Sequence, residues 1–333
     1  MPTMPDTWDD VDRQIAAVLQ IAGRASWGAV ARFLDLPERT VARRGQRLID
    51  LGVIKVSTYL DAITAYAARS VVVRLRAASG QARAVAASVA ERADASSVSI
   101  LEGSRQVVAL LILSDQARVA TVLLDELPAI PGVVSSESTT VLRPYRSGYD
   151  WMATGVISAG VRAEVEAEIL GALDDGTGPV SGLTEADERL IALLAEDGRM
   201  PATRLAEQLG LKTGAVRRRI EQLIATGTLR VRAEVRPSLF GLHVEAMAWL
   251  RVPPSRVDDL GRRLAESGSV RFCSATTGEF QLMVDVLARD EHELLEFLAQ
   301  TVGSVDGART GEVELVLAPV RRGPLSINVG EFA

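Results

Sequence analysis

The chain repeats itself over a long distance. Residues 12–56 align without a gap with residues 187–231, so each position in the first segment meets the position 175 residues later. The same offset persists downstream, where Gly103 falls on Gly278. This period is far longer than that of any solenoid repeat. The sequence therefore predicts a tandem duplication of a two-domain unit, which gives four small domains in 333 residues.

Each copy begins with the spacing of short amphipathic helices. In the second copy, Leu205 and Leu209 share one face of a helix that ends at Gly210. The buried side of the next helix carries Val216, Ile220 and Leu223. Gly227 ends that helix, and an extended segment begins at Leu229. Two short helices around a glycine turn are typical of a helix-turn-helix, and the extended segment indicates the start of a wing.

The first copy follows the same plan. We expect its three helices over residues 9–21, 26–34 and 37–51. Ser26 is placed to cap the second of them. Gly45 stands where the second copy has Ile220, so the third helix lacks one core side chain and some helix propensity.

Basic and amide side chains lie on the outward face of the third helix in each copy. In a major groove, arginine reads guanine edges and glutamine reads adenine edges, while flanking arginines hold phosphates. The candidate DNA-binding residues are Arg39, Thr40, Arg43, Arg44, Gln46 and Arg47 in the first copy, and Lys212, Thr213, Arg217, Arg218, Arg219 and Gln222 in the second. A solvated basic face on an ordinary helical pair is the alternative interpretation.

The distribution of charge favours the first interpretation. The net charge is −6, which by itself argues mildly against a nucleic-acid partner. However, residues 24–56 carry seven bases and three acids, and residues 199–232 carry eight bases and two acids. Two basic patches on an acidic body are what binding in a DNA groove requires.

After each basic segment the pattern changes to short β-branched runs separated by helical spacing. The order in both copies is β-α-β-β-α-β, which is that of a ferredoxin-like domain. Such a sheet leaves one face open, so we expect the two sheet domains to pair, within the chain or between chains. The predicted fold class is α+β, with two winged helix-turn-helix domains and two ferredoxin-like domains in a tandem repeat.

These patterns place the domain boundaries. We expect a first winged helix-turn-helix domain at 1–60, a first sheet domain at 61–147, a linker with one helix at 148–182, a second winged helix-turn-helix domain at 183–235, a second sheet domain at 236–323, and a tail at 324–333.

Composition excludes several classes of protein. Cys273 is the single cysteine, so an intrachain disulfide framework and a cysteine-rich metal site are excluded. No apolar run reaches the length of a membrane span, and the first residues have neither the basic nor the apolar region of a signal peptide. We expect a cytoplasmic protein with no membrane partner, no metal and no cofactor.

The combination of domains resembles the Lrp/AsnC (feast/famine) transcription regulators. The resemblance covers nearly the whole chain, once per half, and is better in the second half. The matching residues are Gly198-Arg199, Leu205-Ala206, Gly210-Leu211, Val216 with Arg218-Arg219-Ile220, Leu223, Gly227 and the turn Thr277-Gly278-Glu279-Phe280. Family members normally carry one such unit and dimerise through the sheet domain. The resemblance therefore implies a sequence-specific DNA-binding regulator, built here as a fused pair and forming homodimers or higher homo-oligomers.

The resemblance also implies a site for a small effector. In the family, the sheet domain senses amino acids or related metabolites near the turn that joins the central strands. Carried over, the candidate residues are Gly103, Gln106, Thr277, Gly278, Glu279 and Gln281. The family commonly has an acidic residue where both copies have glutamine, and glutamine offers an ammonium group only neutral hydrogen bonds. A turn that only supports packing of the sheet domains is the alternative.

The start of the recognition helix also departs from the family pattern. The family often caps this helix with serine, where this chain has Pro37 and Lys212. Neither side chain can accept the backbone N–H bonds that a serine would, although Lys212 could reach a phosphate.

Two other functions remain as alternatives. A related branch with this architecture decarboxylates sirohaem-type tetrapyrroles and relies on histidines. This chain has two histidines, His243 and His292, and neither stands at metal-ligand spacing or beside a cysteine or carboxylate pair, so we do not expect an enzyme. The other alternative is a ligand-sensing module that has lost DNA binding, and the basic helices argue against it.

Overall fold

The computed structural model describes residues 8–60, 68–171, 183–323 and 325–326. The chain divides into two compact units, one made of residues 1–61 with 152–240 and the other of residues 62–151 with 241–333. Both helix-turn-helix segments fall in the first unit, the helical unit, and both sheet segments in the second, the sheet unit. The four domains expected from the sequence are thus grouped as two pairs of like domains. No helix in the described ranges is long and apolar enough to cross a membrane.

The helical unit contains the same elements twice. Its first copy has α1 (Asp10–Ile21), α2 (Trp27–Leu34), α3 (Glu38–Asp50) and β1 (Ile54–Leu60), and its second has α8 (Glu185–Glu196), α9 (Ala202–Leu209), α10 (Thr213–Ala225) and β6 (Leu229–Val235). Every bound in the second copy lies 175 residues after its counterpart, as the sequence repeat predicts. The linker forms one further helix, α7 (Ala159–Gly171), which belongs to the same unit.

Side-chain caps fix where several of these helices begin. The Ser26 hydroxyl accepts the Ala29 N–H at 3.1 Å, which confirms the cap expected at α2. At α8, Thr184 and Asp187 form a reciprocal capping box. The start of α3 at Pro37 and the start of α10 at Lys212 have no side-chain cap, as expected.

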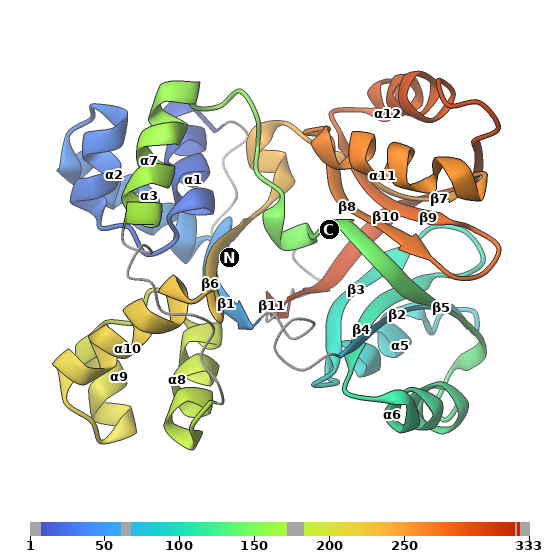
Figure 1. Ribbon diagram of the computed structural model, residues 1–333, viewed down its shortest axis with the longest axis horizontal. Helices are drawn as coiled ribbons and strands as arrows, with labels where there is room; N and C mark the ends of the chain where they lie inside the picture. The colour runs from blue at the N-terminus through green and yellow to red at the C-terminus, as the bar shows by residue number, and fades with distance from the viewer. Residues whose placement is uncertain (1–7, 61–67, 172–182, 324, 327–333) are drawn as a thin grey trace. The chain divides into compact units, whose positions relative to one another are not determined.

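The expectation of a wing in each helix-turn-helix domain is not met among the described residues. Each extended segment is a single strand, and β1 pairs antiparallel with β6 of the other copy, from Ile54 opposite Val235 to Leu60 opposite Leu229 (Figure 1). A strand that finds its partner in the equivalent strand of the other copy does not need a second strand of its own hairpin to satisfy its backbone groups. The two helix-turn-helix domains are therefore joined by a continuous ladder.

The sheet unit is also built from two copies. The first consists of β2 (Arg69–Ala77), α5 (Ala82–Ala90), β3 (Ala95–Leu101), β4 (Val107–Leu113), α6 (Gln116–Thr121) continued by the π-helical turn η1 (Val122–Glu126), and β5 (Val133–Arg146). The second consists of β7 (Val244–Arg251), α11 (Val257–Glu266), β8 (Val270–Thr276), β9 (Leu282–Ala288), α12 (Glu291–Phe297) continued by η5 (Leu298–Val302), and β10 (Arg309–Arg322), followed by the short β11 (Leu325–Ser326). Short 3-10 turns lie at η2 (Gly148–Asp150), η3 (Pro237–Phe240) and η4 (Pro254–Arg256).

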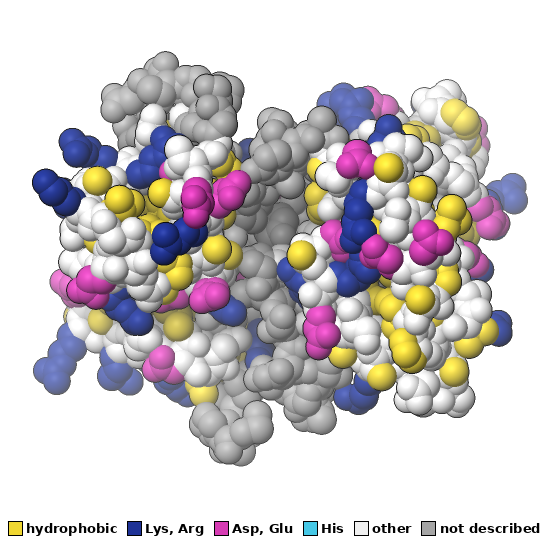
Figure 2. Space-filling model, turned by 90° about the horizontal axis from the view of Figure 1, so that it is seen from below, with side chains coloured by type: hydrophobic (Ala, Val, Ile, Leu, Met, Phe, Trp, Pro, Cys, Tyr) yellow, Lys and Arg dark blue, Asp and Glu magenta, His cyan; other side chains and the backbone are white. Residues whose placement is uncertain are grey.

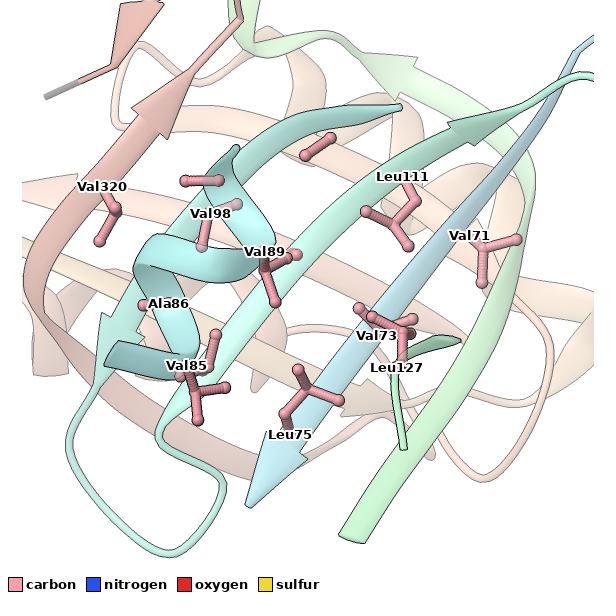
Figure 3. Close-up of a cluster of buried hydrophobic side chains, with 14 of the residues drawn as sticks. Val71, Val73, Leu75, Val85, Ala86, Val89, Val98, Leu111, Leu127 and Val320 are labelled. Atoms are coloured by element: carbon pink, nitrogen blue, oxygen red, sulfur yellow. The ribbon is translucent and has the colours of Figure 1, made fainter. Parts of the chain in front are cut away.

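Each copy forms a four-stranded sheet with helices on one face. The strand order is β3-β4-β2-β5 in the first copy, and β8-β9-β7-β10 in the second. In the first copy, α5 covers the sheet over a core that includes Val73, Leu75, Val85, Val89 and Leu111 (Figure 3). Alternation along the strands places Val73, Leu75 and Leu111 on the face that α5 covers. The side chains between them point to the opposite face of the sheet.

That other face is covered within the chain. The long strands change sheets half-way, because β5 pairs with β2 and then with β8, while β10 pairs with β7 and then with β3. The apolar cluster that lies apart from the two helix-covered cores contains Val72, Leu101, Val108, Met247, Trp249, Phe280 and Met283. The expected pairing of the two sheet domains therefore occurs inside one polypeptide.

Candidate nucleic-acid interface

The recognition helix of the first copy, α3, presents basic side chains to solvent. Val41, Gly45 and Leu48 are buried on its inner side. Arg39, Arg43 and Arg47 are exposed, and Arg47 lies 5.5 Å from the ring centre of Trp8. Gln46 donates to the Asp50 carboxylate at 2.8 Å, and Thr40 is half-buried. Within the described ranges, neither Arg39 nor Arg43 has a carboxylate partner, so both side chains are available to an anion.

The second recognition helix, α10, also presents basic side chains to solvent. Lys212, Thr213, Arg217 and Arg218 are exposed. Gln222 is exposed too, but its side-chain oxygen accepts a hydrogen bond from Arg219 Nη1 at 2.7 Å. In the face drawn in Figure 2, Lys and Arg side chains project at separate points from the helical unit, with Asp and Glu side chains between them.

Two of the arginines predicted to contact DNA form ion pairs inside the protein. Arg44 Nη1 lies 2.6 Å from Asp9 Oδ2 and 3.0 Å from Asp12 Oδ1. At the equivalent place, Arg219 holds Asp187 with two hydrogen bonds of 2.6 and 2.7 Å. These pairs tie each recognition helix to the first helix of its own copy. The guanidinium groups of Arg44 and Arg219 therefore have carboxylate partners within the protein, unlike those of Arg39 and Arg43 among the described residues.

The pairing changes the ionisation of the buried carboxylate. The hydrogen bonds from Arg219 lower the pKa of Asp187 from 3.8 to about 2, although burial opposes the shift. Asp187 is 3% exposed, so its charge is stabilised almost entirely by Arg219 and by the capping hydrogen bonds of Thr184. The sequence contains a signal for this pair, since aspartate and arginine recur in both copies 32 residues apart.

A second pair of arginines joins the two copies. Arg24 donates from Nη1 to the Gly198 carbonyl oxygen and from Nη2 to that of Met200, the latter at 3.2 Å. Arg199, at the equivalent position, donates to Gly23 and Ala25 carbonyl oxygens at 2.8 and 2.9 Å. Both arginines contributed to the basic patches counted in the sequence. Burial lowers the pKa of each guanidinium, and each serves the junction between the copies.

The glycines that precede these arginines allow the close approach. A Cβ atom at Gly198 would lie 2.8 Å from backbone atoms of Val56 and Ser57 in β1. The Gly198 N–H instead donates to the Val56 carbonyl oxygen at 3.0 Å. A Cβ atom at Gly23 would lie 3.1 and 3.2 Å from side-chain methyl carbons of Val56 and Val231. Only glycine at position 198 allows the two backbones to approach this closely, and each glycine precedes an arginine that bonds to the other copy.

The core of the first copy differs from the expectation at Gly45. The indole of Trp27 fills the place of the missing side chain, because a Cβ atom at position 45 would lie 2.3 Å from a ring carbon. The second copy has Ala202 and Ile220 at the equivalent positions, so a small and a large side chain are exchanged between neighbouring helices. The third helix of the first copy does not lack packing; it receives it from α2.

The predicted effector residues lie at the two turns between the central strands. Gln106 and Gln281 accept the N–H groups of Ala77 and Val252 through their side-chain oxygens, at 3.1 and 3.0 Å. Thr277 exchanges hydrogen bonds with Thr140, and Glu279 forms an ion pair with Arg251. All of these bonds are internal to the sheet unit.

The glycines of the two turns face different groups. A Cβ atom at Gly103 would meet the carboxylate of Glu314, and one at Gly278 would meet the methyl group of Thr139. Near the first turn, Arg74 is 6% exposed, stacks 3.9 Å from the ring centre of Trp249, and pairs with Glu312 and Glu314. Burial raises the pKa of the Glu314 carboxyl, and Arg74 opposes that shift.

The described residues contain no group of histidine, cysteine, aspartate and glutamate side chains that could hold a metal. His243 is exposed. His292 is exposed on α12 and lies 3.5 Å from Glu296.

Models of known protein families match both helix-turn-helix segments and the second sheet domain. The model of the AsnC-type helix-turn-helix domain matches residues 9–49 and again residues 183–224. The model of the Lrp/AsnC ligand binding domain matches residues 245–325. The two helix-turn-helix matches start 174 residues apart, in agreement with the internal repeat.

Known relatives are regulators of half the length. An uncharacterized HTH-type transcriptional regulator of Pyrococcus furiosus is 29% identical over 135 residues, which are 40% of this chain and 91% of the relative. The HTH-type transcriptional regulator LrpA of Pyrococcus horikoshii is 25% identical over 126 residues, which are 38% of this chain and 89% of that protein. One relative thus corresponds to one half of this chain.

A solved structure matches the chain along its length. The siroheme decarboxylase NirDL superposes with a TM-score of 0.59, covers 97% of this chain and 96% of its own, and is 14% identical. At that identity the likeness concerns the fold alone. The two helix-turn-helix matches, the ligand-domain match and the relatives decide the family. The chain belongs to the Lrp/AsnC family of helix-turn-helix transcription regulators, as a tandem-duplicated form that carries two family units in one polypeptide.

Proposed function

We propose that the helical unit binds double-stranded DNA in a sequence-specific manner, with α3 and α10 as its two reading helices. The observation that carries the proposal is that one compact unit holds both helices, each with exposed arginines on its outer face. Arg39, Arg43 and Arg47 on α3, and Arg217 and Arg218 on α10, are the groups available for bases and phosphates.

The two reading helices should recognise different half-sites. Arg39, Thr40 and Arg47 are replaced in the second copy by Gly214, Ala215 and Gln222. Arg43 and Arg218, in contrast, are the same residue at equivalent positions. The operator is then an imperfect palindrome, with a shared contact from Arg43 and Arg218 and different bases beside it.

The test is a binding titration on a duplex that the wild-type chain selects from a random library. We expect Arg43→Ala to weaken binding by roughly tenfold or more, which corresponds to the 1–3 kcal/mol of one bidentate base contact, and to relax the preference in one half-site only. Arg218→Ala should do the same in the other half-site. Arg189→Ala is the control, because that arginine lies on α8, outside both reading helices, and donates to the Gln208 carbonyl oxygen on α9. Equal damage to both half-sites by either variant would contradict the assignment.

We propose that the sheet unit senses a small effector, such as an amino acid or related metabolite, at the turn around Gly103. That turn lies beside the charged groups Glu314, Arg105 and Glu312, while at the turn around Gly278 the glycine faces Thr139 and Glu279 already pairs with Arg251. A zwitterion needs both signs of charge, and the first turn supplies them. Adding each amino acid to the DNA titration should change the affinity for at most a few of them, and Glu314→Gln should abolish that change without altering the affinity measured without ligand.

The likeness to NirDL supports a second function only through the fold. A second structure of that enzyme contains an iron-uroporphyrin III analogue. Titrating this chain with iron uroporphyrin and following its absorbance would reveal tetrapyrrole binding. A saturable spectral shift, followed by release of carbon dioxide, would favour an enzyme over the regulator.

A further inference from the structure

One side chain of the second copy contacts the first copy at three points. Arg199 lies in the loop between α8 and α9. Its guanidinium donates to the carbonyl oxygens of Gly23 and Ala25, at 2.8 and 2.9 Å, and lies 4.3 Å from the ring centre of Trp27. The two hydrogen bonds fix the loop that leads into α2. The cation–π contact fixes Trp27, the first residue of α2.

Trp27 in turn supports the recognition helix α3. Its ring occupies the space beside Gly45, where a Cβ atom would come within 2.3 and 2.5 Å of two ring carbons. Gly45 is buried in the middle of α3, between the exposed positions Arg43 and Gln46. The Trp27 ring is therefore the core group that α3 packs against at Gly45, and it sets the distance between this stretch of α3 and the core.

The equivalent arginine of the first copy, Arg24, contacts the second copy but has no aromatic ring beside it at the position equivalent to Trp27. Arg24 of the first copy donates to the Gly198 and Met200 carbonyl oxygens, which are the equivalent partners. The position equivalent to Trp27 is Ala202, and the position equivalent to Gly45 is Ile220, which is 5% exposed and supplies its own packing. A path of direct contacts therefore leads from the second copy to the recognition helix of the first, and no equivalent aromatic link leads back.

We propose that Arg199 is a positioning residue for the recognition helix α3, so that a residue of the second copy controls how the first copy reads its half-site. The role in reading rests on the proposed DNA binding. The link from Arg199 through Trp27 to Gly45 is a property of the helical unit alone and can be tested without DNA.

The first experiment measures backbone hydrogen exchange of the full chain by mass spectrometry. In Arg199→Ala, amides of α3 around Gly45 should exchange several-fold faster than in the wild type, while those of α10 stay unchanged. Arg24→Ala should leave α3 unchanged, and so should Arg189→Ala, which removes an arginine bonded within its own copy. Unchanged exchange in α3, or equal acceleration in both helices, would overturn the proposal.

The second experiment removes the link and restores the packing. The double variant Trp27→Ala with Gly45→Ile copies the Ala202 and Ile220 pair of the second copy into the first. In this background, Arg199→Ala should no longer accelerate exchange in α3. If it accelerates exchange as much as in the wild type, Trp27 does not transmit the effect and the proposal fails. If Arg199→Ala does not fold, Arg199→Lys is measured in both backgrounds with the same two outcomes.

The third experiment asks whether the link matters for reading. On the selected duplex, Arg199→Ala should lose roughly tenfold in affinity for the half-site that Arg43→Ala identifies, and should keep its discrimination at the other. Loss at the other half-site, or at both equally, would overturn the role in reading. If the wild type binds no duplex at low salt, the DNA-binding proposal fails, and hydrogen exchange alone decides whether Arg199 positions α3.

Discussion

Arginines at similar places in the two copies have three different roles. Arg43 and Arg218 are exposed on the reading faces, Arg44 and Arg219 hold carboxylates, and Arg24 and Arg199 join the copies. A planar guanidinium has donors that fit a base edge, a carboxylate or two carbonyl oxygens. The neighbouring groups determine which of these partners each arginine has. A count of basic residues in the sequence therefore overstates the positive charge available to DNA.

The ion pair between Arg219 and Asp187 predicts a dependence of stability on pH. The pKa of Asp187 is about 2 in the folded chain, below its ordinary value of 3.8, so the stabilisation is present above pH 3.8 and is lost as the pH falls toward 2. We expect the helical unit to lose about 2 kcal/mol of its free energy of unfolding over that range from this group. Urea unfolding at a series of pH values measures the loss.

Asp187→Asn should remove most of this dependence and lower the stability at pH 7. The matched control is Glu196→Gln, which removes an exposed carboxylate from the end of the same helix and should leave the pH profile nearly unchanged. A profile of Asp187→Asn that is parallel to that of the wild type would show that the carboxylate is not stabilised by its partner.

At the scale of elements, the two reading helices predict opposite effects of the same substitution. Gly45→Ala places a methyl group against Trp27, so overpacking should cost about 1–3 kcal/mol and exceed the ~1 kcal/mol gained in helix propensity. Gly214→Ala in α10 meets nothing within 4 Å and should be neutral or stabilising by up to about 1 kcal/mol. Chemical denaturation compares the two variants. A stabilising Gly45→Ala would contradict the packing of Trp27 against α3.

The sequence predicted the order and approximate bounds of these elements, because helical and strand spacing are local properties. It did not predict that β1 and β6 pair, because the extended segments look the same whether they form a hairpin or a ladder between copies. It also missed the exchange of Trp27 with Gly45, which requires knowing that the two residues touch. The effector residues remain a prediction, and Gln106 and Gln281 have internal hydrogen bonds that spacing could not reveal.

At the scale of the whole molecule, one chain should fill two half-sites. Both reading helices belong to one unit joined by the β1–β6 ladder, so the phosphate contacts of both are made in a single binding event. The dependence of log affinity on log salt should then be roughly twice as steep on the full duplex as on a half-site duplex, since each phosphate contact adds about 0.9 to the slope. Fluorescence anisotropy at several salt concentrations measures both slopes.

Light scattering of the complex provides the control for that prediction and also tests the expected homo-oligomer. The open faces of the two sheet domains already cover each other within the chain, so burying them does not require a second copy. One chain per duplex agrees with the prediction. Equal slopes on the two duplexes, with two chains bound to the full one, would mean that each chain reads a single half-site.

The ladder between β1 and β6 also has a consequence for synthesis on the ribosome. The core of the first helix-turn-helix domain includes Ala233, Val235 and Leu239, which are translated roughly 180 residues after Val56. At ~5–20 residues per second, the first domain waits on the order of 10 to 30 seconds for these side chains. During that interval β1 has a free edge and part of the apolar surface of α1 is uncovered. The first half of the nascent chain therefore exposes a strand edge and apolar surface, the features that promote aggregation, until the second half emerges.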